Sequence, residues 1–168
     1  METAQNPELA HELLQMAKTD QEMRARAKKD ASVWNDEIDH ANTARLREIV
    51  HENGWPTISL VGPEASQAAW LLVQHAYADP AFMKQCLELM KAAGEDVASA
   101  NVAFLEDRLL TMEGRPQIYG TQFRKGENGW EPFPIQEPDR VDDLRASASL
   151  GTLVENVERI RSMYGDEP

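Results

Sequence analysis

Cysteine is almost absent from this sequence of 168 residues: Cys86 is the single one, so no disulfide can form within the chain. A chain without disulfides is typical of a reducing compartment. The N-terminus lacks a basic-then-apolar signal peptide, and no apolar run approaches the ~20 residues that span a bilayer. We therefore expect a cytoplasmic protein that does not enter a membrane, with Cys86 as a small core residue.

Basic residues are also scarce, because 17 Lys and Arg face 29 Asp and Glu and give a net charge of −12. Nucleic acids and anionic membrane surfaces both attract basic proteins. We therefore expect neither as a partner. The ordinary effect of such a charge is solubility.

The strong motifs of catalysis and cofactor binding are missing as well. The sequence has no GxxxxGK[ST], GxGxxG, HExxH, CxxC or GxSxG. Its histidines, His11, His40, His51 and His75, do not fall at a standard metal-ligand spacing. We expect a chain that folds without a metal or a cofactor.

What the sequence does contain is one strongly apolar helix, whose apolar residues run from Ala65 to Tyr77. Gly62 is predicted as its N-cap and Pro63 as its first helical residue, because proline loses no hydrogen bond at that position. Apolar residues cover nearly every side of this helix, which indicates that it is buried. The segment before it, Thr57–Val61, is a short β-prone run.

His75 lies near the end of this central helix, on the same face as Leu71 and Leu72. A buried imidazole needs a partner or a changed pKa. It is therefore either a histidine satisfied within the core or an acid–base group. Asp79 follows one turn later and is placed either to orient this ring or to cap the next helix.

Helical periodicity and capping residues predict the rest of a mainly α fold, a single domain over residues 1–168 with about six helices and one β-hairpin. The hairpin is expected near Gln117–Ile135, in the C-terminal third, with Asn128-Gly129 as its turn. Gly120 within its first strand indicates a close approach of backbone or ligand. The other helices are expected over about Pro7–Lys29, Ser32–Glu52, Pro80–Ala93, Glu95–Met112 and Leu153–Met163, with a short one over Arg140–Ala146.

A few polar residues interrupt apolar or β-prone stretches in several of these elements. Inward polar groups tend to meet, because each needs a partner in the interior. The set is Asp39, Asn42, His75, Asp107 and Tyr119. For Asp39 and Asn42, the alternative to a site is a structural ion pair or a cap. Asp107 and its neighbour Arg108 form either an internal salt bridge or part of a polar site.

If these residues meet in a cleft, His75 is the natural acid–base group. Tyr119, Gln122 and Arg108 are then the natural donors to an anionic or carbonyl group. We expect His75, Tyr119 and the Asp107–Arg108 pair to lie together around the end of the central helix.

The phrases GWPTISLVG, AAWLLVQHA, LEDRLL, GRPQIYGTQF and VDDLRASASLGTL resemble, in that order, a bacterial family of unknown function, DUF6624. The resemblance covers about Asp39–Leu153. Members of the family typically carry a second arginine within the triplet that reads Asp143-Leu144-Arg145 here, so Arg145 alone matches. The resemblance implies that Gln74, His75, Asp107, Arg108, Gln117, Tyr119, Gly120, Thr121 and Gln122 belong to the family pattern.

Two functional hypotheses follow. In the first, a polar pocket binds a small-molecule or peptide-like ligand and performs metal-independent acid–base chemistry. In the second, the chain is a non-catalytic binding or immunity-type module in which the same residues are structural. The residues expected to be catalytic are His75, Asp107 and Tyr119, and those expected to bind ligand are Asp39, Asn42, Gln74, Arg108, Gln117, Thr121, Gln122 and Arg145.

Overall fold

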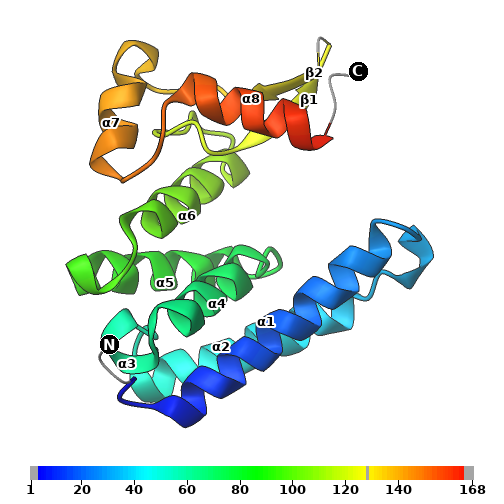
Figure 1. The fold of residues 1–168 in the computed structure, drawn as a ribbon, viewed down its shortest axis with the longest axis vertical. Coiled ribbons are helices and arrows are strands. Elements are labelled where there is room, and N and C mark those ends of the chain that lie inside the picture. The colour runs from blue at the N-terminus through cyan, green and yellow to red at the C-terminus, as the bar shows by residue number, and fades with distance from the viewer. Residues whose placement is uncertain (1–3, 128, 165–168) are drawn as a thin grey trace. The chain divides into compact units, whose positions relative to one another are not determined.

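The computed structural model describes residues 4–127 and 129–164, and the mainly α prediction is confirmed within them. Eight α-helices and one antiparallel hairpin of two strands make up these described residues (Figure 1). The chain divides into two compact units, Met1–Val97 and Ala98–Pro168, here called unit 1 and unit 2. The expectation of a single domain stays a prediction.

Unit 1 is entirely helical in its described part, and α4 packs against both α1 and α2. Caps explain where its helices begin, since the side chain of Asn6 accepts a hydrogen bond from the Leu9 amide at 3.1 Å and Asp79 accepts one from Phe82 at 3.0 Å. The helices are α1 (Pro7–Ala27), α2 (Asp36–Asn53), α3 (Ile58–Val61), α4 (Pro63–Gln74) and α5 (Pro80–Ala93), with 3₁₀ turns at Ala31–Val33 and Gly94–Asp96.

The core of unit 1 comes from the apolar stripes of these helices. Leu13, Leu46, Val73 and Met83 are fully buried. Cys86 is buried with them, as predicted, and burial raises the pKa of its thiol to about 12. A thiol with such a pKa stays protonated and unreactive at neutral pH.

The structure differs from the sequence prediction at Thr57–Val61, where the β-prone run contains the single helical turn α3. Asp96 causes this, because its carboxylate accepts hydrogen bonds from the Ser59 amide at 2.8 Å and from the Ser59 hydroxyl at 2.5 Å. A tertiary contact of this kind overrides weak β propensity. The central helix also ends earlier than predicted, at Gln74, and His75 is its C-cap residue.

Unit 2 combines helices with the predicted hairpin. Strands β1 and β2 pair antiparallel, with Phe123 opposite Pro132 and Gly126 opposite Gly129, while Asn128 lies outside the described residues. Helix α8 packs against β2, where the rings of Trp130 and Tyr164 lie 5.1 Å apart. The elements are α6 (Ser99–Met112), β1 (Phe123–Gly126), β2 (Gly129–Pro132), a 3₁₀ turn (Pro138–Arg140), α7 (Val141–Ser147) and α8 (Leu153–Tyr164).

The first strand is shorter than predicted, because residues 117–122 form an irregular loop. An alternating strand over residues 117–123 would put Gln117, Tyr119 and Thr121 on one face, but Gln117 and Thr121 are buried while Tyr119 is only half-buried. Gly120 adopts a φ of +66°, outside the range of a strand. The predicted close approach is real, because a Cβ atom at Gly120 would lie 2.8 Å from the Leu153 side chain.

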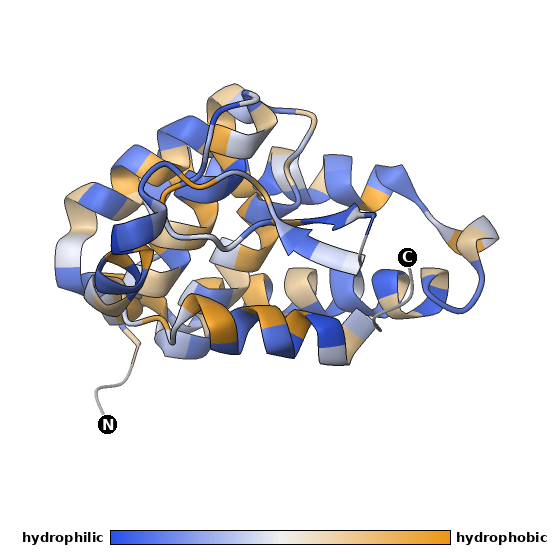
Figure 2. Cartoon of the chain, turned by 90° about the horizontal axis from the view of Figure 1, so that it is seen from above, coloured by the Kyte–Doolittle hydropathy of each residue, from blue (hydrophilic) through white to orange (hydrophobic). Residues whose placement is uncertain are grey.

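Hydrophobic and hydrophilic residues alternate along the helices, as amphipathic helices require (Figure 2). None of the helices in the described ranges combines the length and the apolar character that crossing a membrane demands.

Candidate functional site

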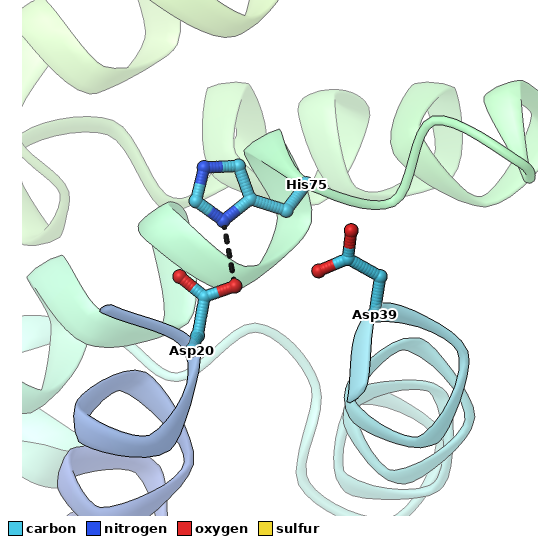
Figure 3. Close-up of side chains that lie close together, drawn as sticks. All are labelled: Asp20, Asp39 and His75. Atoms are coloured by element: carbon cyan, nitrogen blue, oxygen red, sulfur yellow. Dashed lines mark hydrogen bonds and ion pairs between the residues drawn. The ribbon is translucent and has the colours of Figure 1, made fainter. Parts of the chain in front are cut away.

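The candidate site in unit 1 centres on a hydrogen bond between His75, at the end of α4, and Asp20 on α1. The Nδ1 atom of His75 lies 3.0 Å from Oδ1 of Asp20 (Figure 3). Asp20 has no exposed surface, whereas the His75 side chain remains 15% exposed. The ring thus joins a buried carboxylate on one side to a surface that solvent reaches on the other.

Arg24 ties this pair to α2. Its Nε donates to Oδ1 of Asp20 at 3.1 Å, one helical turn away, and its Nη2 donates to Oδ1 of Asp39 at 2.6 Å. Gln21 donates to the other oxygen of Asp20 at 2.7 Å. The predicted inward-facing Asp39 therefore has an ion-pair partner, which the sequence analysis had proposed as the structural alternative.

These contacts keep Asp20 ionised. Burial raises the pKa of its carboxyl, but the hydrogen bonds from His75 and Gln21 and the charges of His75 and Arg24 outweigh burial, so the pKa lies below its usual value. An ionised Asp20 can only accept hydrogen bonds. The Nδ1 nitrogen of His75 is therefore the donor in this hydrogen bond, and Nε2, on the far side of the ring in Figure 3, is the nitrogen left for another partner.

A cavity of about 230 Å³ adjoins this pair. Two of its aromatic residues are unusually exposed for their size, Trp34 at 45% and Tyr77 at 50%. The guanidinium of Arg24 stacks 5.0 Å from the centre of the Trp34 ring, which fixes one wall. The cavity is lined by Trp34, Asp36, Asp39, His40, Thr43, His75, Tyr77 and Ala78.

The same residues bear on the prediction that no metal is bound. Asp20, Asp39 and His75 each offer a ligand atom, and these atoms lie within 4.8 Å of one another. The guanidinium of Arg24 already bridges the two carboxylates, so it supplies the positive charge that a metal ion would bring. The expected absence of a metal stays a prediction.

Asp20 and Arg24 are not among the site residues predicted from the sequence, although the pattern of α1 contains a signal for Asp20. Leu13, Asp20 and Met23 follow one another at helical steps on α1, and all three are buried. Asp20 is thus a charged residue at a core position of an apolar stripe. The same signal identified Asp39 on α2, and Asp79, the alternative partner for His75, caps α5 instead.

In unit 2, the carboxylate of Asp107 organises the loop of residues 117–122. Its Oδ1 accepts the Ile118 amide at 2.7 Å, and its Oδ2 accepts both the amide and the hydroxyl of Thr121, at 3.0 and 2.9 Å. The Tyr119 amide donates to the same carboxylate at 3.1 Å. Burial raises the pKa of Asp107, and these donors offset only part of the rise.

Gln117 fastens the other side of the loop with its side chain. The amide nitrogen donates to the carbonyl oxygens of Gln122 at 3.0 Å and Phe133 at 2.9 Å, and the amide oxygen accepts the Gln122 N–H at 2.9 Å. The fully buried side chain of Gln117 therefore satisfies backbone groups that a neighbouring strand would satisfy in a sheet. Arg145 completes the set by donating to the Tyr119 carbonyl at 2.7 Å.

A comparison with known protein families identifies the family of this chain. The model of a family of unknown function, DUF6624, matches residues 7–167. The chain belongs to this family. The match is wider than the resemblance over Asp39–Leu153 and covers described residues of both units. No match was found among curated proteins or among solved structures.

The DUF6624 fold brings the predicted site residues together in two sets. In unit 1, a chain of hydrogen bonds links His75 to Asp39: His75 bonds Asp20, and Arg24 bonds both Asp20 and Asp39. Gln74, which precedes His75 in the sequence, is buried. Asn42 on α2 and Arg108 on α6 are half-buried. That His75 shares one pocket with Tyr119 stays a prediction. In unit 2, the set comprises Asp107, Gln117, Tyr119, Thr121, Gln122 and Arg145.

Proposed function

We propose that unit 1 binds a small amine-bearing ligand in the cavity beside His75 and exchanges a proton with it. The single observation that supports this is the hydrogen bond between His75 and the buried Asp20, at the wall of a cavity that solvent reaches. A histidine held by a buried carboxylate is the usual arrangement of a general base.

The acid–base step uses both nitrogens of His75. Nε2 accepts a proton from the ligand, the N–H at Nδ1 stays directed at Asp20, and the imidazolium that forms is stabilised by the charge of Asp20. The proton returns from Nε2 when the reaction or the binding event ends. No metal takes part in this step.

The cavity walls favour a cation as the ligand. Aromatic rings attract ammonium groups, and the lining includes Tyr77 and Trp34, the second of which already holds the guanidinium of Arg24 over its ring. Asp36 adds a carboxylate that accepts a hydrogen bond from the Trp34 indole, while the carboxylate of Asp39 is already paired with Arg24. His40 and Thr43 bring further polar atoms, which suit the hydrogen bonds of a primary amine.

The residues of unit 2 favour the second hypothesis for their own part of the chain. Asp107, Gln117 and Thr121 direct their side chains at the loop itself and at the hairpin. We infer that these three are structural. If His75 is inert as well, the chain is a binding module without chemistry.

Benzylamine tests the binding half of the proposal, because it joins an ammonium to an aromatic ring. Titration followed by NMR should shift the Trp34 indole signal and the amides around His75. Trp34→Ala should abolish these shifts, while benzyl alcohol, which has no charge, should produce none. Equal shifts with the alcohol would contradict a site for cations.

Hydrolysis of p-nitrophenyl acetate tests the chemical half, because an accessible neutral imidazole accelerates it. We expect His75→Gln to remove most of the rate above background and His11→Gln, an exposed control, to leave it unchanged. The melting temperature of His75→Gln should stay within a few degrees of wild type. Unchanged hydrolysis would refute the acid–base role, and a marked fall in the melting temperature would show that His75 is structural.

A further inference from the structure

Unit 2 contains a surface groove of about 340 Å³ that involves α6, α7 and α8. It combines two guanidinium groups with an apolar side, and the loop that precedes α8 forms part of it. Its residues are Phe104, Arg145, Leu150, Gly151, Thr152, Glu155, Asn156 and Arg159.

Arg145 is the buried cation of this groove, with an exposed fraction of 3%. Its Nε donates to the Gly151 carbonyl at 2.5 Å, and its Nη1 donates to the Tyr119 carbonyl at 2.7 Å. Its Nη2 has no hydrogen-bond partner within residues 4–127 and 129–164. Nη2 is not sealed from solvent, so it is a donor that a ligand entering the groove can use.

Arg159 is the second cation. Its Nη2 donates to Oδ1 of Asn156 at 2.7 Å, and its Nη1 reaches the sulfur of Met163 at 3.5 Å. A thioether is a weak acceptor that an anion would readily replace. Burial lowers the pKa of Arg145, and the smaller effect of the Arg159 charge acts in the same direction, while the carboxylates of Asp142 and Asp107 oppose both.

The first backbone amides of α8 are already used. The Thr152 amide donates to Glu155 at 2.8 Å, and the Leu153 amide donates to Asp142 at 2.7 Å. The two arginines are therefore the charged donors that the groove offers a ligand.

We propose that this groove binds a small organic acid, with its carboxylate between Arg145 and Arg159 and its apolar part against Phe104 and Leu150. Guanidinium groups bind carboxylates through paired, charge-assisted hydrogen bonds. Two arginines and Glu155 leave one net positive charge in the lining, and the carboxylates of Asp142 and Asp107 also act on Arg145, so the groove favours a ligand with no more than one negative charge. A phosphate dianion would exceed that charge and repel Glu155.

Benzoate tests this site in the full-length chain, followed by NMR at the amides of Gly151 and Asn156. We expect a saturable shift in the wild type and about tenfold weaker binding in Arg159→Gln, a substitution at an exposed residue that removes one charge-assisted contact. Arg161→Gln removes an exposed arginine from the same helix and should change the affinity less than about twofold.

Three outcomes would overturn the proposal. The first is the lack of any shift at these amides up to about 50 mM benzoate, far above the range of a specific site. The second is equal affinity in the wild type and Arg159→Gln. The third is tighter binding of inorganic phosphate than of benzoate, which would exclude the assignment to a carboxylate. None of these outcomes bears on benzylamine binding in unit 1.

Discussion

Asp20 is a charged residue at a buried position of α1, where an apolar side chain would need no hydrogen-bond partner. Burying a carboxylate is costly unless hydrogen bonds and opposite charge compensate. Asp20 receives both, from His75, Gln21 and Arg24. This cost at a core position supports the acid–base role proposed for His75.

Because the pKa of Asp20 is lowered in the folded chain, we predict that the free energy of unfolding depends on pH. The ordinary value of this pKa is 3.8, and its value in the folded chain is lower, so the unfolded state binds its proton first as the pH falls. Its stabilisation is fully present above 3.8 and is lost as the pH falls through the folded value. Urea unfolding should therefore show the difference between wild type and Asp20→Asn shrinking from about pH 5 to pH 2. A constant difference over this range would contradict the assignment.

At the scale of elements, the helices were predictable because their signals are local. The stripe of α1, the proline start of α4 and the aspartate cap of α5 all act within a few residues. The loop of residues 117–122 was not predictable, because its shape depends on Asp107 from another element. The sequence marked Asp107 as an inward polar residue but held no sign that its partners are backbone amides.

The pairing of His75 with Asp20 was out of reach for a related reason. The two residues are 55 positions apart, and helical periodicity gives faces without saying which faces meet. The sequence offered a nearby partner for His75, Asp79, but this residue caps α5 instead. Only the packing of α4 on α1 reveals the partner.

Replacing Asp107 tests how far it holds the loop. Asp107→Asn turns one acceptor oxygen into a donor facing backbone amides, so we expect a loss of about 2–3 kcal/mol in the free energy of unfolding. Asp143→Asn, an exposed position in the same unit, should stay within about 0.5 kcal/mol of wild type. Chemical denaturation measures both. Equal stabilities of the two variants would show that the loop does not depend on Asp107.

Two glycines separate the cost of a backbone conformation from the cost of a clash. Gly120 and Gly114 both have positive φ, +66° and +70°. A Cβ at Gly120 would lie 2.8 Å from Leu153 and 3.1 Å from Ile135, whereas one at Gly114 would meet nothing within 4 Å. We expect Gly114→Ala to cost about 1 kcal/mol and Gly120→Ala about 2–3 kcal/mol more. Thermal melts compare them, and equal costs would show that Leu153 and Ile135 move aside freely.

At the scale of the whole molecule, each compact unit has its own buried residues. Met83 and Leu46 lie in unit 1, and Leu105 and Val141 lie in unit 2. Whether the chain unfolds as one domain or as two is therefore open to direct measurement.

Hydrogen exchange in the full-length chain provides that measurement. Asp107→Asn should reduce the protection of amides in residues 98–164 and leave residues 4–97 as in the wild type, because the damage is confined to unit 2. Asp143→Asn should change neither region. An equal loss of protection in both regions would show one cooperative domain, as the sequence analysis expected.

The way the loop is held has a consequence for chain length. Asp107 accepts hydrogen bonds from the amides of Ile118, Tyr119 and Thr121, whose spacing along the chain is fixed. An inserted or deleted residue in the loop would therefore move every later amide away from its acceptor. Glu127 at the end of the hairpin is exposed. Homologous chains that gain or lose residues should do so at the hairpin end, and a peptide tag placed beside Glu127 should be accepted where one placed between Gln117 and Gln122 would not.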